Sequence, residues 1–310
     1  MKEYAEETND GGGWKITTTA KIPKGLHVRR TGADFTKGSV VVKSGTYLSP
    51  PALGIIASAA RAEVRVYKKP EVAVLSTGDE LIDPHDREVT RRDFAPGPGK
   101  IMNSNLYLLS GLLKDAGAAP RPLGIAKDTP EAIAEKISMG LKVADIVITT
   151  GGASVGSYDF IPAALELLGF EVMIWKMDIK PGRPFIFGLK KGPNPHFNKY
   201  VFGLPGNPAS SMVSYLKLIR PAVYKLCGRS EPLAATVVSG ELNGEVRQDR
   251  ERTTYLRSRI FFEGGKAVID APKKQDSNIL SSALSANCLA VIPPGDSILP
   301  AGTVVAAEII

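Results

Sequence analysis

Hydrophobic and polar positions alternate in two different rhythms along this chain, and the rhythm changes near residues 70 and 230. Between these points, short runs of β-branched residues are followed by longer helical patterns. The clearest run, residues 145–150 (DIVITT), predicts a buried strand and is followed by two glycines. Strands are predicted at 72–75, 122–126, 145–150, 172–175, 185–188 and 200–203, and helices at 105–116, 130–141, 161–168 and from Pro208 to about Cys227. This alternation predicts a doubly wound, mostly parallel α/β sheet.

The two flanking regions have patterns of hydrophobic and polar residues that differ from that of the central region. Residues 1–68 alternate like β-structure, include the run Val40-Val41-Val42, and carry one short helical pattern at 51–61. From residue 230 the pattern is all β, with strands predicted at 234–239, 254–262, 266–270, 288–292 and 303–309 and a hairpin turn at 263–266. The chain of 310 residues is too long for one ordinary core. We therefore expect three parts: a partial β-rich region (1–68), an α/β domain (69–229) and a small C-terminal β-barrel domain (230–310).

Charge and composition narrow the possible partners. The net charge of +7 suits an anionic substrate, nucleic acid or a generally basic surface. The chain has no arginine-rich helix and no interleaved aromatic platform, so a nucleic-acid partner is not expected. The two cysteines, Cys227 and Cys288, have neither metal-ligand nor disulfide-framework spacing, which favours the reducing cytoplasm. No apolar run is long enough for a membrane span, and the acidic N-terminus does not resemble a signal peptide.

The first polar loop after a predicted strand is Ser76 to Leu81 (STGDEL). Ligands of doubly wound sheets bind beyond the carboxyl ends of the strands, which is where this loop falls. Gly78 allows a sharp turn after Thr77, and the carboxylates of Asp79 and Glu80 could hold Mg²⁺ together with phosphates. The alternative interpretation is a helix cap or a solvated turn.

Two further loops combine glycines with hydroxyl or amide groups. Residues 149–159 (TTGGASVGSYD) contain Gly151, Gly152 and Gly156 with Ser154, and their backbone N–H groups could cradle an anion. Asp159 adds a carboxylate for a metal or for proton transfer. Residues 203–211 (GLPGNPASS) supply Gly206, Asn207 and Ser210 at the start of a helix, whose N-terminus favours a phosphate. The alternative for Asn207 is a helix cap.

Cations and isolated carboxylates complete the candidate groups. Lys176, Lys180 and Arg183 flank a rigid turn and suit a dianion such as phosphate or molybdate, or else form a solvated basic loop. Upstream, Asp34 follows two arginines and a glycine. Asp128 is most simply a cap for the helix that is predicted from Pro130.

The motifs VRRTGADF, STGDEL, KIMNSN, TTGGASVGSYDF, KPGRPFIFG and GLPGNPASS occur in this order. This order resembles the molybdopterin molybdenumtransferase family, which the E domain of gephyrin also represents. The resemblance covers roughly residues 14–310, and the C-terminal stretch QDSNILSSALSANC shares it. GLPGNP after KPGRP is the most specific part.

The resemblance implies an enzyme that inserts molybdenum from molybdate into adenylylated molybdopterin, with release of AMP and use of Mg²⁺. By matching motif, the catalytic residues would be Asp34, Glu80, Asp128, Asp159, Lys176 and Lys180, with Glu80 and Asp159 also holding the metal. Substrate would be bound by Thr77, Gly78, Gly151, Gly152, Ser154, Gly156, Arg183, Gly206, Asn207, Ser210, Arg257 and Ser277. Arg257 and Ser277 would border the cleft across the interface of a homodimer. The preceding adenylyltransferase of the pathway is a further expected partner.

The sequence also departs from the family pattern. Family members begin further upstream, so this chain is expected to lack the N-terminal segment and its acidic cleft residues. Arg183 stands where lysine is frequent. A non-catalytic scaffold of the same fold, as in gephyrin, is one alternative, and an enzyme of the related competence-damage family that acts on nucleotides is another. GLPGNP and the C-terminal β domain argue against the latter, and Asp159, Lys176 and Lys180 favour catalysis over a scaffold.

Overall fold

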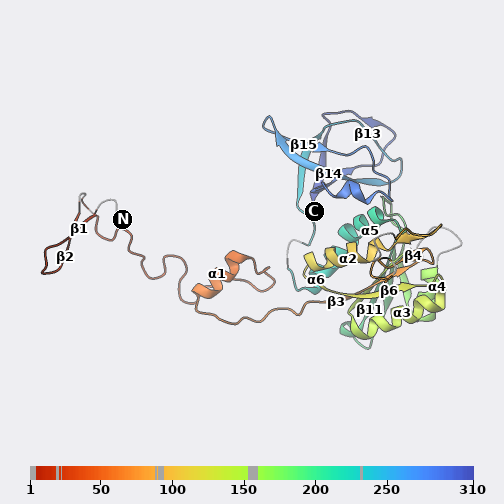
Figure 1. Ribbon diagram of the computed structural model, residues 1–310, viewed down its shortest axis with the longest axis horizontal. Helices are drawn as coiled ribbons and strands as arrows, with labels where there is room; N and C mark the ends of the chain where they lie inside the picture. The colour runs from red at the N-terminus through yellow and green to blue at the C-terminus, as the bar shows by residue number, and fades with distance from the viewer. Residues whose placement is uncertain are drawn as a thin grey trace. The chain divides into compact units, whose positions relative to one another are not determined.

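A computed structural model describes residues 5–18, 21, 23–87, 89, 94–152, 160–230 and 233–310. The chain divides into two compact units, Met1–Glu63 and Val64–Ile310. Figure 1 follows the chain from its red N-terminal hairpin to its blue C-terminal sheet. None of the described helices is long and apolar enough to cross a membrane.

The first unit contains little regular structure. Strands β1 (Ala5–Asn9) and β2 (Trp14–Thr18) form an antiparallel hairpin, and α1 (Pro50–Ser58) begins at the cap Ser49, whose hydroxyl accepts from Ala52 N. The β-structure that was expected around the run Val40-Val41-Val42 is not formed. Val40 is 74% exposed, and glycines with positive φ, Gly38 and Gly45, flank the run. An apolar run without a neighbouring strand has no ladder to join, so its β propensity is not realised.

The second unit is built on a six-stranded sheet in the order β6-β3-β7-β11-β10-β8. Its strands are β3 (Glu71–Thr77), β6 (Ala119–Ala126), β7 (Ile146–Thr150), β8 (Glu171–Trp175), β10 (Ile186–Lys190) and β11 (Lys199–Leu204). The neighbours β6, β3, β7 and β11 run parallel, whereas β10 pairs antiparallel with both β11 and β8. The expected mostly parallel, doubly wound sheet is confirmed, with an antiparallel edge.

Helices cover both faces of this sheet because alternate strand residues point to opposite sides. Val72 and Val74 of β3 join a core with α2 (Ser104–Asp115) and α5 (Pro208–Ser214). Ala73 and Leu75 join a second core with α3 (Pro130–Val143) and α4 (Phe160–Leu167). The helix expected from Pro208 to about Cys227 continues from α5 through a π-helical turn, η3 (Tyr215–Ile219), into α6 (Arg220–Leu226).

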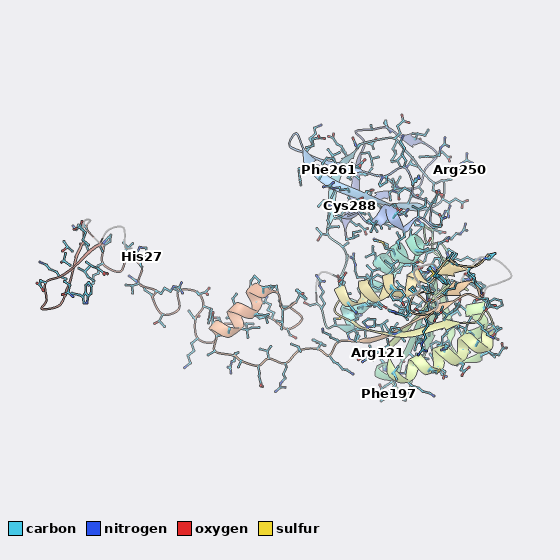
Figure 2. All side chains as sticks on the ribbon, in the orientation of Figure 1. His27, Arg121, Phe197, Arg250, Phe261 and Cys288 are labelled. Atoms are coloured by element: carbon cyan, nitrogen blue, oxygen red, sulfur yellow. The ribbon has the colours of Figure 1, made fainter. Side chains whose placement is uncertain are left out.

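The C-terminal strands form a second six-stranded sheet in the order β15-β12-β18-β16-β14-β9, and an extra β15–β14 pairing closes it like a barrel. Its strands are β12 (Val237–Leu242), β14 (Thr253–Glu263), β15 (Lys266–Asp270), β16 (Cys288–Ile292), β18 (Val304–Ile309) and β9 (Ile179–Lys180). Cys288 is fully buried within this sheet (Figure 2). Strand β9 belongs by sequence to the α/β region, yet it pairs parallel with β14. The C-terminal sheet therefore includes a strand that lies, along the chain, between β8 and β10 of the first sheet.

Short elements complete the second unit. The two-residue strands β4 (Leu81–Ile82) and β5 (Ile101–Met102) pair parallel with each other, and β13 (Val246–Arg247) pairs antiparallel with β17 (Ile298–Leu299). Two 3₁₀ helices, η2 (Pro195–Phe197) and η4 (Leu280–Ala283), lie in the connections.

Candidate active site at the carboxyl edge of the sheet

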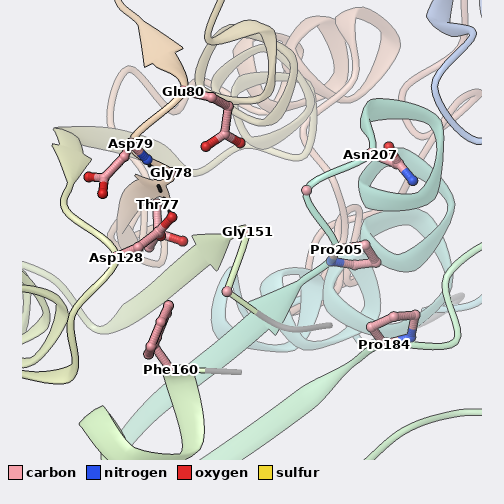
Figure 3. Close-up of a pocket in the computed structure, with 12 residues that line it drawn as sticks. Thr77, Gly78, Asp79, Glu80, Asp128, Gly151, Phe160, Pro184, Pro205 and Asn207 are labelled. Carbon is pink, nitrogen blue, oxygen red and sulfur yellow. Dashed lines mark hydrogen bonds between the residues drawn. The ribbon is translucent and has the colours of Figure 1, made fainter. Parts of the chain in front are cut away.

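An open pocket of about 560 Å³ lies at the carboxyl ends of β3, β7 and β11. It is lined by Thr77, Gly78, Asp79, Glu80, Asp128, Gly151, Gly152, Phe160, Pro184, Pro205, Gly206 and Asn207. In Figure 3 the carboxylates of Asp79, Glu80 and Asp128 lie on one side, and Asn207, Pro205 and Pro184 lie on the other. The position matches the general rule for doubly wound sheets.

The loop after β3 is folded tightly around Gly78. A Cβ at Gly78, where φ is 149°, would lie only 2.6 Å from Glu80 Oε2. Glycine therefore lets the Glu80 carboxylate lie back over the backbone. The Asp79 N–H donates to Asp128 Oδ2 at 3.3 Å, which brings three carboxylates from two loops to one side of the pocket.

Asp128 is a pocket residue and not the helix cap that was its simplest interpretation. Thr129 occupies the N-cap of α3, and its hydroxyl accepts from Ala132 N at 3.3 Å. Burial raises the pKa of the Asp128 carboxyl, and the charges of Glu80 and Asp79 raise it further, while the hydrogen bond from Asp79 N opposes them. A cation at this place would relieve the repulsion among the carboxylates.

Gly151 and Gly152 begin the second loop and pack directly against the first. A Cβ at Gly151, where φ is 86°, would lie 2.3 Å from the carbonyl oxygen of Thr77. The Gly151 N–H donates to Leu204 O at 3.2 Å, so this group is used within the protein and is not part of an anion cradle. The remaining expected members of this loop, Ser154, Gly156 and Asp159, lie outside the described residues.

The third loop connects the pocket to the C-terminal domain. Asn207 occupies the N-cap position of α5, but its side chain makes no capping bond there. Asn207 Nδ2 donates instead to Ser277 Oγ at 2.9 Å, and Ala209 N donates to Ser277 O at 3.1 Å. Ser277 therefore reaches the pocket rim within one chain, whereas we expected it from across a dimer interface. Ser210 is buried and does not line the pocket.

The basic loop at 176–184 reaches the pocket through Pro184, and its three cations are not among the lining residues. Lys176 has a left-handed backbone (φ 74°), and its ammonium lies 5.2 Å from the centre of the Trp175 ring. Lys180 Nζ lies 3.2 Å from Asp249 Oδ2. Arg183 holds the turn by its carbonyl, which accepts from Met177 N at 2.9 Å.

Asp249 is the anionic centre of this contact with the C-terminal domain. Arg252 donates to it twice, Nε to Oδ1 at 3.2 Å and Nη2 to Oδ2 at 2.8 Å. The Arg252 hydrogen bond lowers the pKa of the Asp249 carboxyl far below its usual range, with a further lowering by Lys180 and an opposing effect of burial. The basic loop is thus attached to a permanently charged carboxylate at ordinary pH.

Arg257 has a structural role within the C-terminal domain. Arg257 is fully buried in β14, where Nε donates to Ser282 Oγ at 2.7 Å and Nη2 donates to Asp276 O at 3.2 Å. Burial lowers the pKa of its guanidinium. In this chain Arg257 therefore organises the loop that precedes Ser277, and it does not line the pocket. Asp34 is exposed in the first compact unit.

Sequence reasoning did not single out three lining residues, Phe160, Pro184 and Pro205. Each lies within one of the motifs quoted above, beside the polar groups for which the motif was chosen. Within the described part of the chain, no group of three or more His, Cys, Asp or Glu side chains is arranged to hold a metal on its own. A metal bound by these described residues would need further ligands from elsewhere, such as a bound molecule or water.

The second unit combines a doubly wound sheet, with carboxylates and glycine loops at its carboxyl edge, and a small closed β sheet, and the two parts match families of molybdopterin-binding proteins. Residues 73–225 match the family described as "Probable molybdopterin binding domain", and residues 239–310 match the "MoeA C-terminal region (domain IV)".

Two curated relatives and one solved structure are similar over most of the chain. The "Molybdopterin molybdenumtransferase" of Nostoc sp. is 34% identical over 93% of this chain, and that of Haemophilus influenzae is 33% identical over 99%. The crystal structure of a molybdopterin biosynthesis moeA protein from Pyrococcus horikoshii has a TM-score of 0.74 and 28% identity, covering 99% of this chain and 70% of that chain. The chain belongs to the molybdopterin molybdenumtransferase family. It spans 63% of the length of the Nostoc relative and 72% of the Haemophilus relative.

Proposed function

We propose that this chain inserts molybdenum into the molybdenum cofactor by transferring it from molybdate to adenylylated molybdopterin, with release of AMP. Membership of the transferase family supports the reaction class. The single observation that carries the proposal is the pocket in which Asp79, Glu80 and Asp128 face the glycine loops of β7 and β11. Such an arrangement can hold a phosphate-bearing ligand between a polar wall and closely packed backbone.

The acidic wall of the pocket, formed by Asp79, Glu80 and Asp128, suits Mg²⁺ bound together with a substrate phosphate. Mg²⁺ is commonly held by one or two carboxylates, with the remaining positions filled by phosphate oxygens and water. Glu80 and Asp128 would hold the ion. Burial raises the pKa of the Asp128 carboxyl, and the charges of Glu80 and Asp79, which a cation would offset, raise it further. When bound, Mg²⁺ supplies Lewis-acid polarisation of the phosphate. Asp159, which lies outside the described residues, stays a proposed further ligand.

The rest of the site would bind and orient two anionic reactants. The pterin phosphate would be contacted at the rim of the pocket by Thr77, Gly78, Gly206 and Asn207. Lys176, Lys180 and Arg183 extend from the loop that ends at Pro184, and their positive charge would offset the repulsion between molybdate and substrate. Asp34 stays a proposed catalytic residue on the strength of its motif. The chain would act as a homodimer and receive its substrate from the preceding adenylyltransferase.

The test is AMP release from adenylylated molybdopterin with molybdate and Mg²⁺, using this chain and its Glu80→Gln variant. The amide keeps the size of the side chain and removes the charge, so we expect at least a tenfold loss of molybdate-dependent release. Glu71→Gln is the matched control, because Glu71 lies at the opposite end of β3 and pairs with exposed Arg121 at 2.6 Å.

Each outcome has a distinct meaning. Release by the wild-type chain and by Glu71→Gln, with loss in Glu80→Gln, supports the enzyme. Tight binding of the adenylylated pterin without any release would instead support a binding module of the same fold. Equal release by all three chains would remove the acidic wall from the mechanism.

A further inference from the structure

Residues 100–105, the KIMNSN segment, contact two of the three pocket loops but contribute no lining residue. At the first loop, Lys100 Nζ donates to Asp79 O at 2.6 Å and Ile101 N donates to Glu80 O at 2.9 Å. The segment then enters the first turn of α2. Its contacts with the acidic loop are made to backbone atoms, so they fix the course of that loop without occupying its carboxylates.

At the third loop, a single buried amide makes the contact. Asn105 Nδ2 donates to the carbonyl oxygen of Gly206 at 2.7 Å. A carbonyl can only accept, so the amide nitrogen must face it. Asn105 is 7% exposed, and Oδ1 of its side chain has no partner among the described residues. The amide is therefore held by its contact with Gly206 and by its place in the helix.

Helix α2 is a rigid base for this contact. Leu106, Leu109 and Leu113 are almost completely buried against the sheet, and Asn103 caps the helix while accepting from Ser76 Oγ at 2.8 Å. Gly206 itself is exposed at the pocket and lacks a side chain that could restrain it. Because glycine has more backbone freedom than other residues, the hydrogen bond from Asn105 on the fixed helix α2 restrains Gly206.

We propose that Asn105 is a positioning residue, which holds Gly206 and with it the neighbouring Asn207 in the geometry that receives substrate. The kinetic part of this inference rests on the proposed function, because Gly206 and Asn207 are placed there at the phosphate. Asn105 acts through Gly206 and lines no part of the pocket.

The experiment compares Asn105→Ala with Tyr215→Phe in the full chain. Tyr215 is also buried, and its hydroxyl donates to Leu112 O at 3.0 Å on the same helix α2, away from the pocket loops. Each variant removes one buried side-chain donor to a backbone carbonyl. We expect Asn105→Ala to raise KM for adenylylated molybdopterin about three- to tenfold with a smaller change in kcat, the loss of one hydrogen bond. Tyr215→Phe should leave both constants unchanged.

A readout that does not depend on activity is hydrogen exchange of residues 205–211, measured without ligand. Asn105→Ala should accelerate exchange there, and Tyr215→Phe should not. Unchanged exchange in Asn105→Ala would overturn the inference even if the wild-type chain is active. An inactive wild-type chain would refute the proposed function alone, and exchange would still decide the role of Asn105.

Asn105→Asp is a second variant for the case in which the alanine variant fails to fold. A protonated aspartic acid can donate to Gly206 O, whereas the carboxylate cannot. The exchange of residues 205–211, corrected for the wild-type chain at each pH, should therefore approach the wild-type rate as the pH falls. A pH-independent difference would overturn the inference.

Discussion

Asn207 Nδ2 and Ser277 Oγ, 2.9 Å apart, join the pocket rim of the α/β domain to the C-terminal domain of the same chain. The backbone adds a second bond, from Ala209 N to Ser277 O. The rim of the pocket is therefore set by both domains, and the C-terminal domain restrains a pocket residue directly.

The side-chain bond between Asn207 and Ser277 predicts energetic coupling. In a double-mutant cycle of Asn207→Ala and Ser277→Ala, followed by urea unfolding, we expect a coupling free energy of about 0.5–1.5 kcal/mol, the net value of one hydrogen bond. Each single variant should lower the unfolding free energy by little more than this coupling free energy, because the backbone bond from Ala209 N to Ser277 O remains. Strict additivity would mean that the two side chains do not interact in solution.

Gly151 predicts a steric requirement for glycine between two pocket loops. Gly151→Ala should cost about 3 kcal/mol or more in unfolding free energy, from the left-handed φ and from the 2.3 Å approach to Thr77 O. Gly124→Ala is the control, since Gly124 has φ 76° and nothing within 4 Å of an added Cβ. It should cost only about 1–2 kcal/mol. Equal costs would exclude the close approach as the cause.

Arg257 predicts a structural penalty that an exposed arginine lacks. Arg257→Ala removes a fully buried side chain, leaves Ser282 Oγ without its donor, and leaves Asp276 O with the Ile279 N–H as its remaining donor. We expect a loss of about 2–4 kcal/mol in the free energy of unfolding. Arg259→Ala, at an exposed position of the same strand, should stay within about 0.5 kcal/mol of wild type. A stable Arg257→Ala variant that only loses substrate affinity would contradict the structural role.

Asp249 predicts a pH-dependent contribution to stability. Its folded pKa lies below the unfolded value of about 3.9, so its contribution is present above that pH and is lost as the pH falls through the folded pKa. Asp249→Asn should lower the unfolding free energy by about 1–2 kcal/mol at pH 7, and the difference should narrow below about pH 4. Asp296→Asn, in an exposed pair with Arg250, should have a much smaller effect. A difference independent of pH would assign the effect to shape and not to charge.

Much of the fold follows from local sequence signals. The run that begins at Val72 and the helix from Pro130 were placed within a few residues, because a continuous apolar run and an N-terminal proline are local properties. Glu80, Gly151 and Gly206 could be assigned to one pocket because parallel strands end at the same edge.

The remainder depends on contacts between distant parts of the chain. Strand β9 has only two residues and exists because it pairs with Thr253 and Thr254 of β14. Asp128 enters the pocket through a hydrogen bond from Asp79, and Asn105 acts on a glycine 101 residues away. Such relationships leave no periodic pattern in the sequence, so neither propensity nor spacing indicates them.

Strand β9 also limits how the protein can be divided. Ile179 and Lys180 precede the C-terminal domain by about fifty residues, yet they form the edge of its sheet beside β14. A C-terminal fragment cut near residue 230 would present the backbone of Thr253 and Thr254 as an uncovered sheet edge, which invites aggregation. An exchange of C-terminal domains between relatives must therefore carry the 176–184 loop with it, and we expect residues 64–310 to melt as one cooperative block.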